Sequence, residues 1–220
     1  MLDDRLSRPV LWALIASSVL CAAMVGLRIA YTGEGTFRWL IVPNLLLAWI
    51  PLAASRLACR TLAGGRKPGL LAAAWGLVWL AFYPNSSYIV TDLIHLSWAS
   101  DKTTLYFDLS VNMLAAMLGW FLGAISLYGL HLEALRRCGT VAGHLFAAVV
   151  LLLGAVGVYL GRVLRWNSWD LVTRPWRIAA DSIEIVQRPD ALLFILAFGL
   201  FTGAVYAVFY HVARHPRTGR

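Results

Sequence analysis

The sequence has few charged residues. Asp, Glu, Lys and Arg together make up 14% of its 220 residues, whereas hydrophobic residues make up 60% and the mean hydropathy is +0.71. Soluble globular domains usually contain about 25% charged residues, so the composition excludes an ordinary soluble domain. It is typical of an integral membrane protein.

Cysteine is also scarce, and the three residues Cys21, Cys59 and Cys138 form no CxxC pair. This spacing argues against a disulfide framework and against a zinc site. The sequence also has no internal repeat and no low-complexity segment. We therefore expect one polytopic membrane domain over residues 1–220.

The five histidines are not arranged for haem. A haem pathway across a membrane needs facing histidines at paired levels inside the helices, but four of the five fall near the ends of apolar runs on one predicted side: His131, His144, His211 and His215. We predict no cofactor and no metal. A single metal held by the first three of these histidines is a less favoured alternative, because only Glu133 could add a carboxylate.

Long apolar runs are abundant. About 20 residues span a bilayer as a helix, and six runs approach this length: residues 9–28, 39–55, 69–90, 109–130, 144–161 and 191–210. The first run is too long for a signal-peptide core, and no A-x-A-like cleavage site follows it. The sequence thus predicts an all-α membrane fold of about six transmembrane helices.

The charges predict the orientation of these helices. When the connections are assigned to alternating sides, one side receives 11 of the 19 basic residues: Arg5, Arg8, Arg56, Arg60, Arg66, Lys67, Arg136, Arg137, Arg214, Arg217 and Arg220. Only three acids lie on that side, so it carries the whole net charge of +8. The positive-inside rule makes this side cytoplasmic, which predicts a multi-pass inner-membrane protein with both termini in the cytoplasm. A basic total can indicate nucleic-acid binding, but here we interpret it as topology signals and contacts with anionic lipid.

The densest polar cluster is FYPNSSYIVTDLIHLSW, residues 82–98. Pro84 disfavours helix at Tyr83, so the third transmembrane helix is expected to break there. Asn85, Ser86 or Ser87 would then cap a short interfacial helix on the outer side.

On that short helix Tyr88, Asp92 and His95 would share one face. The apolar residues of the opposite face are Ile89, Leu93 and Leu96. The i, i+3 spacing of Asp92 and His95 permits both side chains to move a proton on one substrate.

A second polar segment, GRVLRWNSWDL, covers residues 161–171. If the fifth helix continues through it, one stripe contains Arg162, Arg165, Trp166 and Trp169, and Asn167 and Asp170 take neighbouring directions. An arginine at the edge of an apolar run needs a carboxylate or an aqueous exit. The best candidate partner of Arg162 is Asp92.

After Pro175 the sequence predicts another interfacial helix on the outer leaflet. One side contains Trp176, Ala179, Ala180 and Ile183, and the other contains Arg177, Asp181, Glu184 and Arg188.

These segments are expected to surround an outward-facing polar pocket, to which Asn44, Asp108 and Asn112 also contribute. We predict Asp92 and His95 as catalytic residues. The predicted ligand-binding residues are Asn85, Tyr88, Arg162, Arg165, Asn167, Trp169 and Asp170. An anionic or lipid-like ligand suits the arginines.

The alternative is a non-catalytic membrane subunit or small transporter, in which Asp92 and Arg162 form a structural ion pair. The tryptophans would then be an aromatic belt. In either case three small-residue stripes are expected to be close-packing faces: Gly154, Gly157 and Gly161; Ala115, Gly119 and Gly123; and Gly199 and Gly203.

The motifs FYPNSSYIVTDLIHL and GRVLRWNSWDL resemble the signature of a bacterial family of multipass inner-membrane proteins, domain of unknown function 1361. The resemblance covers the chain from the second helix to the last. It implies a compact helical membrane protein and supports the choice of motifs, but it implies no mechanism.

Overall fold

A computed structural model describes residues 8–33, 36–62, 69–98 and 102–214. Several residues used above lie outside the described residues: Arg5, Arg66, Lys67, His215, Arg217 and Arg220, together with the side chain of His95. In the described ranges the chain is helical, with no strand. The helices are α1 (Arg8–Thr32), α2 (Thr36–Leu62), α3 (Leu70–Tyr88), the 3₁₀ helix η1 (Ile89–Trp98), α4 (Lys102–Cys138), α5 (Thr140–Arg162), α6 (Asp170–Thr173), α7 (Pro175–Ile185) and α8 (Pro189–Arg214).

Five of these helices are long and apolar enough to cross a membrane: Arg8–Thr32, Ile41–Leu62, Thr104–Cys138, Thr140–Arg162 and Pro189–Arg214. They match five of the six predicted runs. The run at 69–90 forms α3, which is not among the five because its last turn and a half is the polar segment PNSSY. The chain is therefore an all-helical protein with the features of a multi-pass membrane protein.

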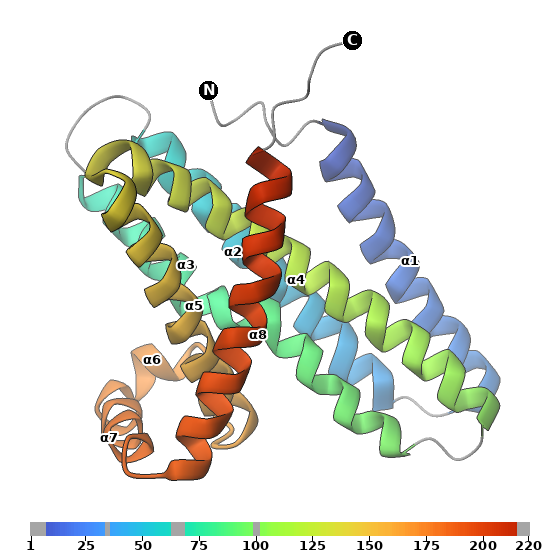
Figure 1. Cartoon of the computed structure of the whole chain (residues 1–220). Coiled ribbons are helices and arrows are strands. Elements are labelled where there is room, and N and C mark those ends of the chain that lie inside the picture. The colour runs from blue at the N-terminus through green and yellow to red at the C-terminus, as the bar shows by residue number, and fades with distance from the viewer. Residues whose placement is uncertain (1–7, 34–35, 63–68, 99–101, 215–220) are drawn as a thin grey trace. The chain divides into compact units, whose positions relative to one another are not determined.

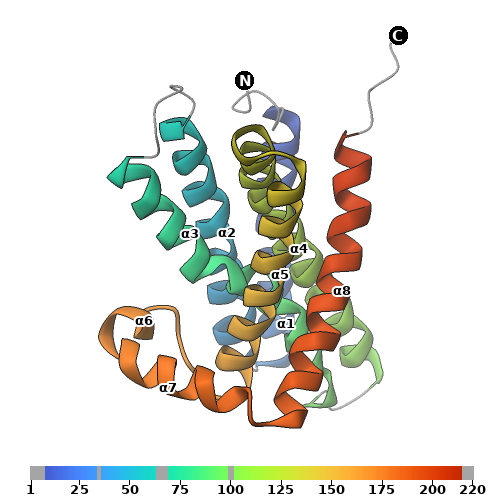
Figure 2. The same cartoon turned by 60° about the vertical axis from the view of Figure 1, so that its left-hand side comes forward.

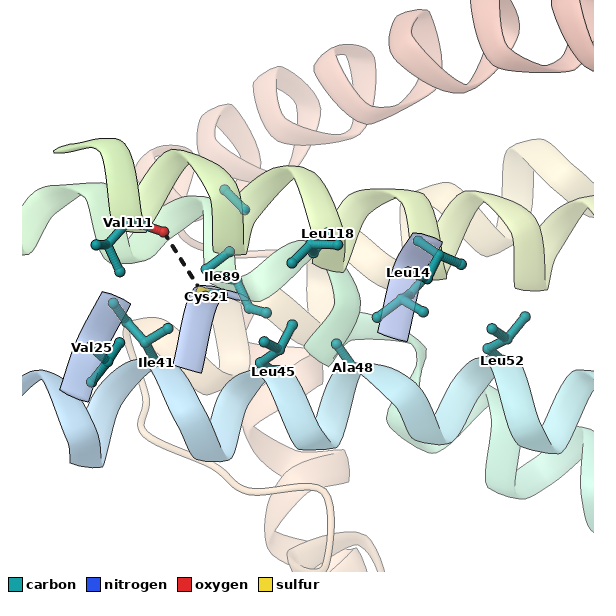
Figure 3. Packing of buried hydrophobic residues seen from close by; sticks show 13 residues of the cluster. Leu14, Cys21, Val25, Ile41, Leu45, Ala48, Leu52, Ile89, Val111 and Leu118 are labelled. Carbon is teal, nitrogen blue, oxygen red and sulfur yellow. Dashed lines mark hydrogen bonds between the residues drawn. The ribbon is translucent and has the colours of Figure 1, made fainter. Parts of the chain in front are cut away.

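The chain divides into two compact units, residues 1–130 and residues 131–220. Unit 1 contains α1, α2, α3, η1 and α4 up to Leu130. Within it α2 and α3 form an antiparallel hairpin (Figure 1). Its core contains Cys21, Val25, Ile41, Ile89 and Val111, which come from four different elements. Figure 3 shows Ile89 pointing between α1, α2 and α4, beside the bond from the Cys21 thiol to the Val111 carbonyl.

The polar segment after residue 82 does not break at Pro84, so this expectation was wrong. Helix α3 continues through Pro84 to Tyr88, and the backbone then tightens directly into η1. Ser86 and Ser87 do not cap a new helix, because their hydroxyls donate to the carbonyls of Tyr83 and Pro84. Such bonds from serine are one way in which proline is accommodated inside membrane helices.

The close-packing stripe on α4 is confirmed for two glycines. A Cβ on Gly119 would lie 2.5 Å from the Ser86 carbonyl oxygen, and one on Gly123 would overlap the Ser86 hydroxyl. Trp79, two turns earlier on α3, donates from its indole nitrogen to Ser126 Oγ at 3.1 Å. The first half of the polar cluster therefore packs α3 closely against α4.

Unit 2 contains the end of α4 and helices α5 to α8. Helices α5 and α8 pack along each other, and Figure 2 shows α7 lying crosswise to both. The core between them contains Ala155, Tyr159, Ile185, Ala191 and Ile195. Gly199 is in ordinary contact with Leu152 and Ala155, whereas Gly203 has open space where a Cβ would be. The expected close-packing role is thus wrong for Gly203.

Candidate functional site

The segment after α5 bends sharply instead of continuing as a helix. Helix α5 ends at Arg162, and the Trp166 amide donates to the Leu160 carbonyl at 3.0 Å. Arg165 lies in the left-handed region with φ 61°, the only described residue other than glycine with positive φ. This bond spans six positions and closes a bend in which a left-handed residue follows the helix, a conformation that usually requires glycine. The predicted stripe of Arg162, Arg165, Trp166 and Trp169 is therefore wrong.

Asp170 organises the next part of the loop. Its Oδ2 accepts a bond from the Asn167 amide at 2.9 Å and from the Asn167 side chain at 3.4 Å, and its Oδ1 accepts one from the Thr173 hydroxyl at 3.3 Å. The bond from the Asn167 amide holds the pKa of the Asp170 carboxyl below its usual range. Asn167 and Asp170 thus fix the fold of the loop.

The loop is also attached to α7. Trp166 donates from Nε1 to Asp181 Oδ2 at 2.7 Å, a bond that links residues 15 positions apart. Arg165, Asn167 and Trp169 are exposed in this arrangement. The side chains available to a ligand are therefore an arginine, an amide and an indole on one anchored loop.

The predicted residues of α3 and η1 lie in unit 1. Asn85 and Tyr88 are half-buried. In a 3₁₀ helix, side chains three residues apart eclipse one another. Tyr88 and Asp92 are four residues apart and do not share a face, so this part of the expectation was wrong. Leu93 and Leu96 do share a face, but Ile89 does not lie on it. The position of His95 follows Asp92 by one 3₁₀ turn.

Asp92 is only 1% exposed. Its Oδ2 accepts a hydrogen bond from the Asn44 side chain of α2 at 3.0 Å. Asn44 and Asp92 were both expected at the polar pocket, and the structure brings these two together. Arg162 belongs to the other unit, so its pairing with Asp92 stays a prediction.

A buried ion pair of unit 1 was not predicted from the sequence. Arg28 of α1 contacts Asp108 of α4 through two bonds, Nε to Oδ1 at 2.6 Å and Nη2 to Oδ2 at 3.0 Å. Arg28 is 5% exposed and Asp108 is 1% exposed. Asn112 donates to the Asp108 carbonyl at 2.8 Å. The available signal was an arginine at the end of one apolar run and an aspartate at the start of another.

Unit 2 contains a cluster of histidine and tyrosine side chains. The less favoured metal site expected His131 and His144 to lie close together, and they do, but the tyrosines were missed. His131 is 2% exposed, and its Nδ1 lies 3.0 Å from the Tyr206 hydroxyl. Its ring stacks on Tyr210 and meets the edge of His144. Nε2 of His131 is the one buried side-chain nitrogen or oxygen without a hydrogen-bond partner in the part of the chain that the structure describes.

No group of three or more His, Cys, Asp or Glu side chains within the described ranges could hold a metal ion. The carboxylate expected to assist the histidines is engaged elsewhere, since Glu133 accepts bonds from Arg136 and Arg137. None of the three cysteines forms a disulfide.

Comparison with known families gives one match. The family described as "Protein of unknown function (DUF1361)" matches residues 43–205. The chain belongs to this family. The matched range includes Asn44, the polar segment of α3 and η1, and the loop after α5. No curated protein and no solved structure matched the chain.

Proposed function

We propose that the protein is a bacterial inner-membrane protein of six spans, with both termini in the cytoplasm and an outward polar region that binds or processes an anionic or lipid-like ligand. Its sixth span is α3, whose 19 residues correspond to about 28 Å of helix. This length approaches the roughly 30 Å hydrocarbon core of a bilayer. Six spans also agree with the location of the excess basic residues on one side.

The observation that carries the ligand proposal is the conformation of Arg165. A residue other than glycine in the left-handed region costs about 1–2 kcal/mol, and strain of this kind is concentrated at functional sites. Here the strained residue is an exposed arginine beside the exposed Trp169. An arginine forks onto a phosphate or carboxylate, and an indole covers an apolar chain or a sugar ring.

The roles of the other site residues follow from this placement. Arg165 and Trp169 contact the ligand, with Arg162 at the base of the loop. Asn167 and Asp170 hold the loop in shape. The roles predicted for Asn85 and Tyr88 in ligand binding and for Asp92 and His95 in proton transfer stay predictions, because these residues belong to unit 1.

The test compares wild-type protein with Arg165→Gly. Glycine is unstrained at this position, so we expect an unchanged or higher melting temperature. We also expect native mass spectrometry with short-chain phosphatidylglycerol as the probe to show at least tenfold weaker binding. Arg60→Gly, at an exposed position in the last turn of α2, is the control for the loss of one arginine. A stable Arg165→Gly protein that binds the probe as wild type does would overturn the ligand proposal.

A second candidate function is a non-catalytic membrane subunit or small transporter whose polar residues clamp helices together. The near-complete burial of Asp92 and its bond to Asn44 favour this reading. It predicts that Asp92→Leu lowers stability while probe binding in the remaining folded protein is unchanged. If Asp92→Leu is fully stable, the clamp is excluded.

The topology has its own test. In a background without the three native cysteines, Gln187→Cys is expected to react with a membrane-impermeant maleimide from outside, and Thr61→Cys only after lysis. Both positions are exposed. Labelling of Thr61→Cys in intact cells would overturn the proposed orientation.

A further inference from the structure

The carboxylates of residues 163–188, here called the α6–α7 cap, are all engaged by their neighbours. Asp170 accepts from Asn167 and Thr173, and Asp181 accepts from Trp166. Glu184 accepts from Arg188 at 2.5 Å, one helical turn away. Neutral donors leave the charges of Asp170 and Asp181 in place, but the four arginines of the cap outnumber its three carboxylates, so its formal charge is +1.

Three arginines of the cap are not held by hydrogen bonds of this kind. Arg165, Arg174 and Arg177 are exposed, and no hydrogen bond or ion pair between described residues holds their guanidinium groups. Arg174 lies near enough to Asp170 to help lower the pKa of that carboxyl, but the Asp170 oxygens are bonded by the loop itself. The accessible charge of the cap is thus positive.

Helix α7 also exposes an apolar stripe. Trp176 is 86% exposed and Ile183, two turns further along α7, is 67% exposed. The two alanines between them, Ala179 and Ala180, are exposed as well. The opposite side of α7 is attached to unit 2 through the buried Ile178 and Ile185. The helix thus turns a tryptophan-containing apolar stripe away from its own unit.

We propose that the α6–α7 cap binds the surface of a bilayer that contains anionic phospholipid, with Arg174 and Arg177 on lipid phosphates and with Trp176 and Ile183 among the upper acyl carbons. The inference rests on the proposed function, because it takes this end of α5 and α8 to lie at the membrane surface. It goes further by naming the lipid class and the residues that select it.

Geometry and chemistry agree on this partner. Helix α7 lies crosswise to two candidate membrane spans (Figure 2), which is the direction that a helix in the membrane plane would have. Basic residues flanking an apolar stripe with tryptophan are typical of helices that lie on anionic bilayers. A soluble polyanion would match the arginines and leave the tryptophan and isoleucine in water.

The experiment uses the full chain reconstituted in vesicles of phosphatidylcholine or phosphatidylglycerol whose acyl chains carry bromine, which quenches nearby tryptophan. The contribution of Trp176 is obtained by subtracting the signal of Trp176→Phe. We expect quenching of Trp176 and a preference for phosphatidylglycerol. Since each arginine near an anionic surface contributes about 1 kcal/mol, the double variant Arg174→Gln/Arg177→Gln should lose about thirtyfold of that preference. The double variant Arg56→Gln/Arg60→Gln, with the same change in net charge, should leave the lipid-dependent quenching of Trp176 unchanged, because these two arginines are expected on the opposite side of the membrane.

Three results would overturn the proposal: an unquenched Trp176, an equal affinity for the two lipids, or an equal loss in both double variants. Competition by 10 mM inorganic phosphate would also overturn it, because the ligand would then be free phosphate. Melting temperatures of all variants exclude misfolding as the cause. The two proposals fail separately: a stable Arg165→Gly protein that still binds its probe removes the loop ligand, whereas a cap without lipid preference removes only the inference drawn here.

Discussion

Polar side chains are paired over very different separations in unit 1 and in the cap of unit 2. In unit 1, Arg28 bonds Asp108 at a separation of 80 residues, and Asn44 bonds Asp92 at a separation of 48. In the cap of unit 2, Asp170 is bonded by residues three positions away and Glu184 by one four positions away. Long-range buried bonds join helices, whereas local bonds shape a loop and leave its arginines exposed. Polar substitutions in unit 1 should therefore change stability, and those in the cap should change binding.

The most severe test of this comparison is to break the Arg28–Asp108 pair. Removing one partner leaves an uncompensated buried charge, so Arg28→Ala or Asp108→Ala should lose about 3–5 kcal/mol of unfolding free energy. The measurement is unfolding of the purified protein by increasing SDS in mixed micelles. The double variant Arg28→Met/Asp108→Leu should recover most of the loss. Single variants as stable as wild type would contradict the assignment of this pair to the fold.

A smaller effect on stability is expected from adding a methyl group where α3 and α4 pack closely. The added methyl of Gly123→Ala would overlap Ser86, and overpacking of this kind costs about 1–3 kcal/mol. Gly203→Ala is the control, because its methyl meets no atom within 4 Å and alanine favours helix by up to about 1 kcal/mol. The same SDS titration compares them. Equal behaviour of the two variants would mean that α3 does not approach α4 closely.

In the cap, Trp166→Phe tests whether bonds there act only locally. It removes one hydrogen bond between the loop and α7. The loss of the indole donor to Asp181 should cost about 1 kcal/mol, confined to this region. Hydrogen exchange should become faster in residues 175–185 and stay unchanged in α1 and α4. Trp176→Phe, which removes an exposed indole, should change neither. Faster exchange throughout unit 1 would show that the cap is not an independent element.

The smallest expected effect is a pH dependence of the loop. The pKa of Asp170 is lowered in the folded protein by the Asn167 amide, so its contribution is fully present above the usual aspartate pKa near 4. That contribution is lost as pH falls through the lowered value. Trp169 fluorescence should therefore change below about pH 4, and Asp170→Asn should abolish this change. A transition that persists in Asp170→Asn would belong to another group.

Helix positions were largely predictable from the sequence, because an apolar run long enough to span a bilayer has few alternatives to a helix. Five of the runs form the candidate spans. The helix from Pro175 was also predicted, since proline suits the first position of a helix and the following residues separate into two faces.

The continuation of the helix through Pro84 could not be predicted from local rules. Proline removes one helical hydrogen bond, but Ser86 and Ser87 bond carbonyls of the same turn, and Gly119 and Gly123 allow that turn to pack against α4. These glycines lie more than 30 residues further along the chain. Tertiary packing thus decided between a break and a continuous helix.

The candidate site was predicted in its residue types more than in its contacts. The sequence identified Arg165, Asn167, Trp169 and Asp170 as a unit, and the structure holds them in one loop. The left-handed Arg165 was not predictable, because that position favours glycine in most helices. The Arg28–Asp108 pair could not be assigned either, since each residue alone resembled the polar edge of an apolar run.

The turn between α4 and α5 has a consequence for how the protein is made. Only Gly139 separates the two helices, its φ is 86°, and Gly143 lies directly against Leu135. Two candidate membrane spans joined by a single residue have no loop between them, so we expect them to insert together as one helical hairpin. A substitution at Gly139 would then reduce the yield of inserted protein more than the stability of the molecules that complete assembly.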